Sequence, residues 1–324
     1  MGSSFISAFA DSSDMEGSRL RSNFQDVAFT TAVPFTDDGS AVDHDALAAN
    51  LADLYDAGAR LFIPCGNTGE YYALTPEERV AVVETHVEAT GDDATIAGGV
   101  GGSLPEVRDL ADAYAAAGAD AVMVMHPDHT YAHEQGLKEY YHAICDTTDL
   151  GVVIYKRGPE VTRRVLVELT EREEVVAVKF AQADVKEFAQ TVEDAAGDVT
   201  WVNGIAERYA LSFAIEGATG YTTGVGNFVP KATLALFEAI EKENWERART
   251  IQRSLRPLED LRDEPGRGSS LASGNNVPVV KEGMDLAGYT GGPVRPPLAT
   301  LSDRDRDRLE RHYDRVASTF GRKA

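Results

Sequence analysis

The chain of 324 residues has only two cysteines, Cys65 and Cys145, and no run of 18 apolar residues. Two isolated cysteines lack the paired spacing of a zinc site and are too few for a disulfide framework, so no metal site and no secreted scaffold are expected. A secretory leader and a long apolar segment are also lacking. These absences favour a cytoplasmic protein that does not enter membranes.

Basic side chains are scarce too. The chain has 31 Lys and Arg against 53 Asp and Glu, a net charge of −22. This charge opposes binding to nucleic-acid phosphates or anionic lipid, so neither nucleic acid nor a membrane is expected as a partner. Only eight of the basic residues are lysine. Because an acid-rich, lysine-poor surface stays soluble when salt screens charge repulsion, we expect a halophilic protein from a salt-rich cytoplasm.

From about residue 26, short β-branched runs alternate with longer segments of helical periodicity, which predicts eight βα units. No G-x-G-x-x-G motif follows the first run, so an α/β (β/α)8 TIM barrel is favoured over an open doubly wound sheet. We expect a flexible N-terminal tail over 1–24, a catalytic barrel over 25–240 and a C-terminal helical extension over 241–324, with helices at 231–262, 278–288 and 302–318. The predicted strands are 27–33, 60–64, 94–100, 121–125, 151–154, 175–180, 199–203 and 220–223.

Lys179 closes the otherwise apolar run 175–180. Barrel enzymes carry their catalytic groups at the C-terminal ends of strands, where desolvation lowers an ammonium pKa and leaves a nucleophilic amine. The other seven lysines lie in polar or helical settings that need no special explanation, apart from Lys156. The pattern therefore indicates a Schiff base between Lys179 and a carbonyl substrate. The alternative is a structural lysine that extends to solvent or pairs with a carboxylate.

Tyr155 follows the apolar run 151–154 and ends the neighbouring predicted strand. A phenol beside an amine can give and take the protons that Schiff-base chemistry requires. The loop after the eighth predicted strand, 224–231, carries glycines that could close the site or bind a phosphate, and the pattern leaves both open.

The segment after the second predicted strand contains Gly66, Asn67 and Thr68. Its backbone N–H groups and the Thr68 hydroxyl could hold a carboxylate. Cys65 in the same segment has no evident His partner, so a small buried residue is favoured over a nucleophile.

Taken in order with the segment 291–298 (GGPVRPPL), these residues resemble the dihydrodipicolinate synthase/N-acetylneuraminate lyase family of class I aldolases, over residues 26–318. The resemblance implies a barrel with a C-terminal helical extension, commonly a homotetramer, that takes a small 2-oxo acid and needs no cofactor. It implies that Lys179 forms the Schiff base, that Tyr155 shuttles protons and that Thr68 and the amides around Asn67 hold the carboxylate. Glu70 would fix the loop.

Several positions depart from the synthases of this family. Asn67 precedes Thr68 where they have Thr-Thr, and His129 stands where they place a tyrosine after the fourth strand. Glu160 stands in place of the arginine that binds their aldehyde substrate's carboxylate, which argues against lysine biosynthesis. The segments 155–157 and 227–231 are similar instead to the branch containing 5-dehydro-4-deoxyglucarate dehydratase, which handles 2-keto-3-deoxy sugar acids.

The resemblance therefore implies a Schiff-base lyase that dehydrates a 2-keto-3-deoxy sugar acid, with or without loss of CO2. The alternatives are a 2-keto-3-deoxygluconate-type aldolase that releases pyruvate, a 4-hydroxy-tetrahydrodipicolinate synthase, and a regulatory barrel that binds a small acid without turnover. Residues after the catalytic lysine line the pocket, and here Phe180, Ala181 and Gln182 replace the branch's usual Asp-Gly. The candidate contacts to the distal part of the substrate are His129, Arg157, Gln182 and Thr223.

Overall fold

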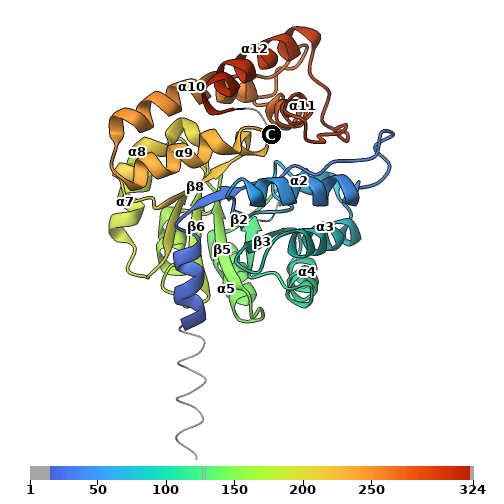
Figure 1. Cartoon of the computed structure of the whole chain (residues 1–324). Helices are drawn as coiled ribbons and strands as arrows, with labels where there is room; N and C mark the ends of the chain where they lie inside the picture. The colour runs from blue at the N-terminus through green and yellow to red at the C-terminus, as the bar shows by residue number, and fades with distance from the viewer. Residues whose placement is uncertain (1–14, 126, 128, 322–324) are drawn as a thin grey trace, which may run out of the picture.

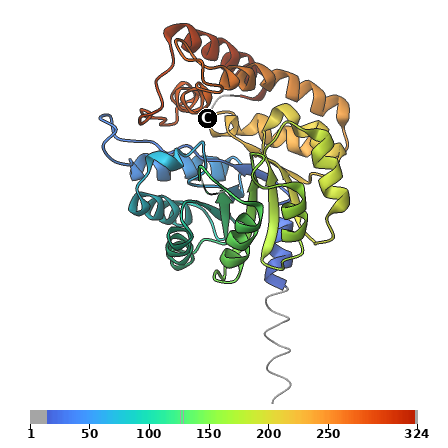
Figure 2. The same cartoon turned by 180° about the vertical axis from the view of Figure 1, so that it is seen from behind.

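Eight parallel strands form a closed barrel in the order β1 to β8, and β8 pairs with β1 to complete it. The computed structural model describes residues 15–125, 127 and 129–321, and it confirms the predicted TIM barrel (Figures 1 and 2). Each predicted strand overlaps an observed one. The strands are β1 (Val27–Phe29), β2 (Leu61–Phe62), β3 (Thr95–Val100), β4 (Ala121–Met125), β5 (Gly151–Lys156), β6 (Val175–Phe180), β7 (Thr200–Asn203) and β8 (Gly220–Thr223).

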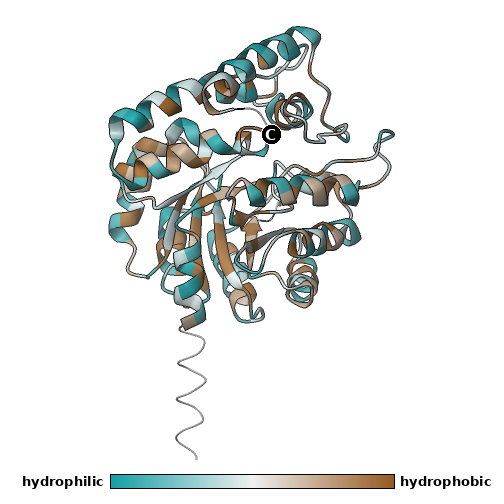
Figure 3. Ribbon diagram, viewed as in Figure 1, coloured by the Kyte–Doolittle hydropathy of each residue, from teal (hydrophilic) through white to brown (hydrophobic). Residues whose placement is uncertain are grey.

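Every residue of the eight strands is buried. Helices cover the outer surface of a parallel barrel and side chains fill its interior, so strands such as β4 and β6 read as nearly continuous apolar runs. Figure 3 shows the apolar residues concentrated on the strands and on the surrounding helices, whereas helices α10 (Trp245–Asp263) and α12 (Asp303–Phe320) are largely hydrophilic.

Short polar side chains cap the first turns of most barrel helices. Asp43, Thr75 and Ser103 accept backbone N–H groups at the starts of three of them, and Thr75 forms a reciprocal capping box with Glu78. No helix in the described part of the chain is long and apolar enough to cross a membrane. The barrel helices are α2 (His44–Asp56), α3 (Pro76–Ala89), α4 (Leu104–Ala117), α5 (Glu134–Cys145), α6 (Arg163–Leu169), α7 (Val185–Asp194), α8 (Ala210–Ile215) and α9 (Pro230–Glu241).

Residues 15–23 form a helix, although they fall within the predicted flexible tail. Leu20 and Phe24 are buried, and the Asn23 side chain donates a hydrogen bond of 2.8 Å to Thr95 at the start of β3. These contacts fix the helix at the N-terminal end of the strands (Figure 1). The first part of the predicted tail, 1–14, lies outside the described residues.

The helices α10, α11 (Asn276–Ala287) and α12, called the extension below, lie at the opposite end of the barrel (Figures 1 and 2). The helix predicted over 231–262 is two helices, because the chain turns at 242–244, where Glu243 has a φ of 51°. α10 packs on the 3-10 helix η2 (Glu207–Tyr209) after β7, and α11 packs on the 3-10 helix η3 (Val225–Asn227) after β8. The extension therefore rests on the rim formed by the C-terminal ends of the strands.

A buried ion pair ties the extension to the loop after β2. Lys281 Nζ on α11 lies 2.6 Å from Glu70 Oε1, and the two side chains are 2% and 0% exposed. Glu70 Oε2 accepts a hydrogen bond of 2.9 Å from the Arg295 backbone, and the Arg295 guanidinium binds both oxygens of Glu78. The expectation that Lys281 needs no special explanation is therefore wrong. Its partner is far away in the sequence.

Replacing Lys281 by methionine should destabilise the fold by about 3–5 kcal/mol, because it leaves the Glu70 carboxylate buried without a counter-ion. Adding Glu70→Gln should recover part of this loss. Urea unfolding measures both effects. Arg306→Ala, which breaks a more exposed pair with Glu282 on the same extension, is the matched control and should cost less than about 1 kcal/mol. A similar cost for Lys281→Met and Arg306→Ala would contradict the role assigned to the buried pair.

Candidate active site

Lys179 and Tyr155 lie side by side at the C-terminal end of the barrel. They are paired across strands β5 and β6, and their side chains are 5% and 6% exposed. Lys179 Nζ lies 4.5 Å from the centroid of the Tyr155 ring. No carboxylate pairs with Lys179 among the described residues, so the alternative of a lysine held by an acid is not supported. The amine stands beside a phenol, as the sequence predicts.

Burial and one positive charge set the protonation of this pair. Desolvation, followed by the nearby Arg157 guanidinium, lowers the pKa of Lys179 to about 7. Desolvation also raises the pKa of Tyr155, while its hydrogen bond with Arg157 and the charge of Arg157 partly offset this. Near neutral pH a large fraction of the Lys179 amine is therefore unprotonated and nucleophilic, and the Tyr155 phenol keeps its proton.

Lys156, the second lysine at a strand end, occupies a different environment. Its Nζ donates a hydrogen bond of 2.7 Å to the carbonyl of Gly158 and lies 3.7 Å from Glu187 Oε1 on α7. Successive side chains of a strand point to opposite faces, so Lys156 points toward the outer helices and Tyr155 toward the interior. Lys179 is the strand-end lysine that lies beside the phenol.

The loop after β2 brings Asn67 to the same place. Asn67 Nδ2 donates a hydrogen bond of 3.1 Å to the Tyr155 hydroxyl. Two residues of this loop that are not glycine, Cys65 and Glu70, have φ values of 56° and 54°. Strain of this kind persists only where the surrounding structure enforces it, and here Glu70 is fixed by the ion pair to α11. The loop is thus held in a shape that its own residues do not prefer.

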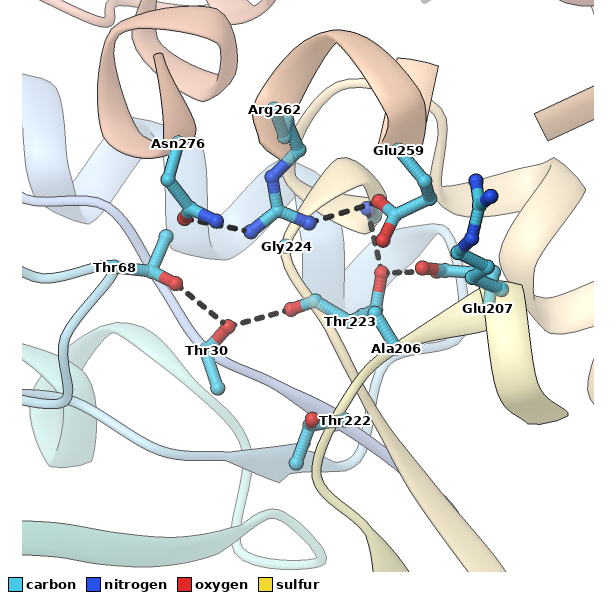
Figure 4. A network of polar contacts seen from close by, with 12 residues as sticks. Thr30, Thr68, Ala206, Glu207, Thr222, Thr223, Gly224, Glu259, Arg262 and Asn276 are labelled. Carbon is cyan, nitrogen blue, oxygen red and sulfur yellow. Dashed lines mark hydrogen bonds and ion pairs between the residues drawn. The ribbon is translucent and has the colours of Figure 1, made fainter. Parts of the chain in front are cut away.

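Thr68 belongs to a chain of hydroxyl groups that crosses the barrel mouth (Figure 4). Its Oγ1 lies 3.1 Å from Thr30 Oγ1, at the end of β1. The Thr30 hydroxyl donates its one proton to the carbonyl of Thr223, at a distance of 2.7 Å. Thr30 must therefore accept from Thr68. A carboxylate at this loop would receive this proton after rotation of the Thr68 hydroxyl, whose oxygen is held in place beside Thr30.

The residues predicted to contact the distal part of the substrate differ in exposure and in whether their polar groups are already hydrogen-bonded. Arg157 is exposed and hydrogen-bonds Tyr155, and Gln182 is half-buried near the end of β6 with its Oε1 unpaired among the described residues. His129 is exposed, and its Nδ1 accepts the backbone N–H of Tyr131. Thr223 is fully buried, and its hydroxyl is taken up by protein groups, which does not support a side-chain contact with substrate.

Cys65 and Gly66 precede Asn67 in the loop after β2. Cys65 is buried, and burial raises the pKa of its thiol to about 12, so it is unreactive, as expected. A Cβ at Gly66 would lie 3.5 Å from the Met123 side chain, an ordinary contact distance, and the predicted contact of Gly66 with a carboxylate stays a prediction.

A buried polar cluster behind Thr223 is not evident from the sequence. Glu207, Glu259 and Arg262 are all buried, and the Thr223 hydroxyl donates to Glu207 Oε1 at 2.5 Å (Figure 4). Glu207 stands in a polar stretch where nothing marks it as buried. Glu259 and Arg262 lie on α10, whose face toward the barrel does carry regularly spaced leucines such as Leu255. The spacing of apolar residues along α10 is the one sequence signal that could have predicted that Glu259 and Arg262 face the barrel.

Replacing Arg157 by glutamine should raise the pKa of the Lys179 amine, because the charge that opposes its protonation is removed. Labelling the protein with acetic anhydride over a range of pH, with mass analysis of the Lys179 peptide, follows this titration. Half-maximal labelling should move to higher pH. Arg163→Gln, which removes an arginine paired with Asp194 on the outer helices, should leave it in place. An unchanged or lower value in Arg157→Gln would contradict the electrostatic role.

Comparison with known proteins agrees with this geometry. The family model described as the dihydrodipicolinate synthetase family matches residues 23–315. The 4-hydroxy-tetrahydrodipicolinate synthase of Methanothrix thermoacetophila is 31% identical over 302 residues, which cover 92% of this chain and 99% of that protein. The probable 5-dehydro-4-deoxyglucarate dehydratase of Pseudarthrobacter chlorophenolicus is 32% identical over 248 residues, 74% of this chain and 78% of that protein.

Among solved structures, the crystal structure of dihydrodipicolinate synthase from Oceanobacillus iheyensis is similar with a TM-score of 0.88 and 31% identity, over 94% of this chain and all of that one. The relatives thus carry two different activity names at nearly equal identity. Although these names differ, the family model matches most of the chain and therefore shows the family. The chain therefore belongs to the dihydrodipicolinate synthetase family of class I aldolases and is a lyase.

Proposed function

We propose that this protein dehydrates a 2-keto-3-deoxy sugar acid through a Schiff base on Lys179. The observation that carries the proposal is the Lys179 amine, desolvated beside the Tyr155 ring with no carboxylate partner among the described residues. An amine whose pKa is about 7 attacks a ketone at neutral pH without further activation. A regulatory barrel that only binds a small acid does not need a reactive amine, so this arrangement favours an enzyme.

The reaction begins when Lys179 Nζ attacks the C2 carbonyl of the 2-oxo acid. The carbinolamine loses water to give an iminium, which draws electrons away from C3. The Tyr155 phenol supplies and recovers the protons of these steps, and Asn67 Nδ2 holds its hydroxyl in position. The Thr68 hydroxyl and the backbone around Asn67 bind the carboxylate.

Dehydration follows from the iminium. Loss of a proton from C3 gives an enamine, and the enamine expels the C4 hydroxyl group, so that one water leaves in all. Hydrolysis of the resulting conjugated iminium frees Lys179. Arg157, exposed at the rim and bonded to Tyr155, is placed to meet an anionic or hydroxylated distal part of the substrate.

A second candidate is supported by the relative from Methanothrix thermoacetophila, which is named as a 4-hydroxy-tetrahydrodipicolinate synthase. That activity joins a 2-oxo acid to an aldehyde acid, and it needs a cation for the aldehyde's carboxylate. At the corresponding place stands Glu160, whose carboxylate adds to the negative charge beside Lys156. This favours the dehydratase over the synthase.

The proposal is tested by incubating the protein with several 2-keto-3-deoxy acids and measuring the mass of the products. We expect one acid to yield a product lighter by one water, or by one water and CO2. Lys179→Met should slow this reaction by roughly four orders of magnitude or more, because it removes the nucleophile. Lys156→Met is the matched control and should retain turnover.

Two outcomes would contradict the proposal. Stoichiometric release of pyruvate, detected by coupling to lactate dehydrogenase, would show an aldolase that cleaves the bond between C3 and C4. Turnover that survives Lys179→Met would exclude a Schiff base at this residue.

A further inference from the structure

The carboxyl group of Glu207 is buried behind the active site with only one of its oxygens paired. Its side chain has no exposed surface, and Oε1 accepts the hydroxyl groups of Thr223 at 2.5 Å and Thr233 at 2.7 Å. Oε2 has no hydrogen-bond partner among the described residues. The preceding Ala206 has a φ of 60° and a ψ of −162°, a conformation that residues other than glycine rarely adopt. An acid held in so strained and dry a place calls for a functional explanation.

The neighbouring charges make the ionised form of Glu207 unfavourable. Glu259 on α10 lies beside it, and burial together with this second carboxylate raises the pKa of Glu207. The one cation of the cluster, Arg262, is engaged by Glu259 at 2.8 Å and by Asn276 at 3.0 Å. Its guanidinium packs on Gly224, where a Cβ would lie 2.4 Å from Nη2.

The other titratable groups around Glu207 do not supply a compensating charge. Tyr221 on β8 is neutral, since burial raises the pKa of its phenol, and it bonds Thr233. Arg208 in η2 is paired with Asp260 on α10. The helix α8, which also packs on η2, has no charged side chain. Glu207 therefore carries a proton at pH values where an exposed glutamate has lost it.

Glu207 is joined to the carboxylate-binding loop through two residues. The Thr223 hydroxyl accepts the backbone N–H of Gly226 at 2.7 Å and gives its own proton to Glu207. The Thr223 carbonyl accepts the proton of Thr30, and Thr30 accepts that of Thr68 (Figure 4). The place of the Thr223 main chain thus determines how Thr30 is oriented, and Thr30 holds the Thr68 oxygen in place at the carboxylate-binding loop.

We propose that Glu207, in its neutral form, is a positioning residue that fixes Thr223 and thereby the Thr68 hydroxyl that receives the substrate's carboxylate. This inference rests on the proposed 2-oxo acid site. As a neutral acid, Glu207 carries its proton on Oε2 and accepts both threonine hydroxyls at Oε1, so no unbalanced charge is buried. When it ionises, two carboxylates face one guanidinium, and their repulsion displaces η2 and the end of β8.

The first test uses pyruvate, the simplest 2-oxo acid, as the probe. The pyruvate concentration that gives half-maximal borohydride-trapped adduct is measured for the wild type, Glu207→Gln and Glu207→Ala. Glutamine keeps the shape and an acceptor oxygen but cannot ionise, so it should match the wild type near pH 6. Alanine should require about tenfold more pyruvate, the equivalent of one lost hydrogen bond. The amount of adduct at saturation should not change, because the reacting groups stay in place.

Thr233→Val is the matched control. It removes the other hydroxyl on Glu207 Oε1, but Thr233 lies on α9 and does not bond Thr30. It should change the half-saturating concentration by less than about twofold. An equal rise in Thr233→Val and Glu207→Ala, or no rise in Glu207→Ala while circular dichroism shows a native fold, would overturn the positioning role.

The second test does not depend on a Schiff base. The folded state holds a proton on Glu207 that the unfolded chain releases above about pH 4.3, so the wild type loses stability as pH rises from there through the raised pKa. Glu207→Gln has no such loss. The difference in Tm between Glu207→Gln and the wild type should therefore grow in favour of the variant from about pH 5 to about pH 7 and level off above that. A difference in Tm that stays constant from about pH 5 to about pH 7 would show that Glu207 is not held neutral in the folded protein, and would overturn the proposal. If the Tm difference grows with pH as expected but neither the wild type nor any variant traps pyruvate, the result would count against the proposed function and not against the neutral form of Glu207.

Discussion

The chemistry proposed for this barrel depends on the removal of one amine from water. Lys179 lies at the end of β6 with 5% of its surface exposed, and desolvation is the main cause that lowers its pKa to about 7. A carboxylate beside it would restore the ammonium form. The chain has 53 acidic residues, yet among the described residues the only charged group that shifts this pKa is a cation, Arg157. The strongly negative protein keeps its acids away from this amine.

The shape of the site is held from outside the barrel. The loop that carries Asn67 and Thr68 is fixed at Glu70 by Lys281 of α11, and the end of β8 is pressed by Arg262 of α10. Both contacts are buried, and the Lys281–Glu70 pair lies in surroundings of low polarity, where opposite charges attract strongly. The extension therefore helps to fix the shape of the site. It contacts both the loop after β2 and the end of β8.

Much of the fold could be predicted from the sequence because its signals are local. The buried strands of a parallel barrel read as apolar runs, and their ends are visible where Tyr155 and Lys179 interrupt the pattern. The face that each side chain takes follows from alternation along the strand, which separates Lys156 from Tyr155.

The remaining features depend on partners that are distant in the sequence. Lys281 looks like an ordinary helical lysine until Glu70 is placed beside it, and Glu207 looks exposed until α10 covers it. The helix at 15–23 is stabilised by burial of Leu20 and Phe24, which a polar segment does not reveal. Positive φ angles at Cys65 and Glu70 are imposed by the fold and leave no trace in residue type. The Thr68 contact is likewise set by Thr30, which is 38 residues away in the chain, and through Thr30 by Thr223 in the last strand.

The location of the covalent adduct decides whether Lys179 is the nucleophile. The protein is incubated with pyruvate, reduced with borohydride and digested, and the modified peptide is identified by tandem mass spectrometry. We predict a single reduced adduct on Lys179, formed with half-maximal rate near pH 7, where half of the amine is unprotonated. An adduct on Lys156, or none on any lysine at saturating pyruvate, would contradict it.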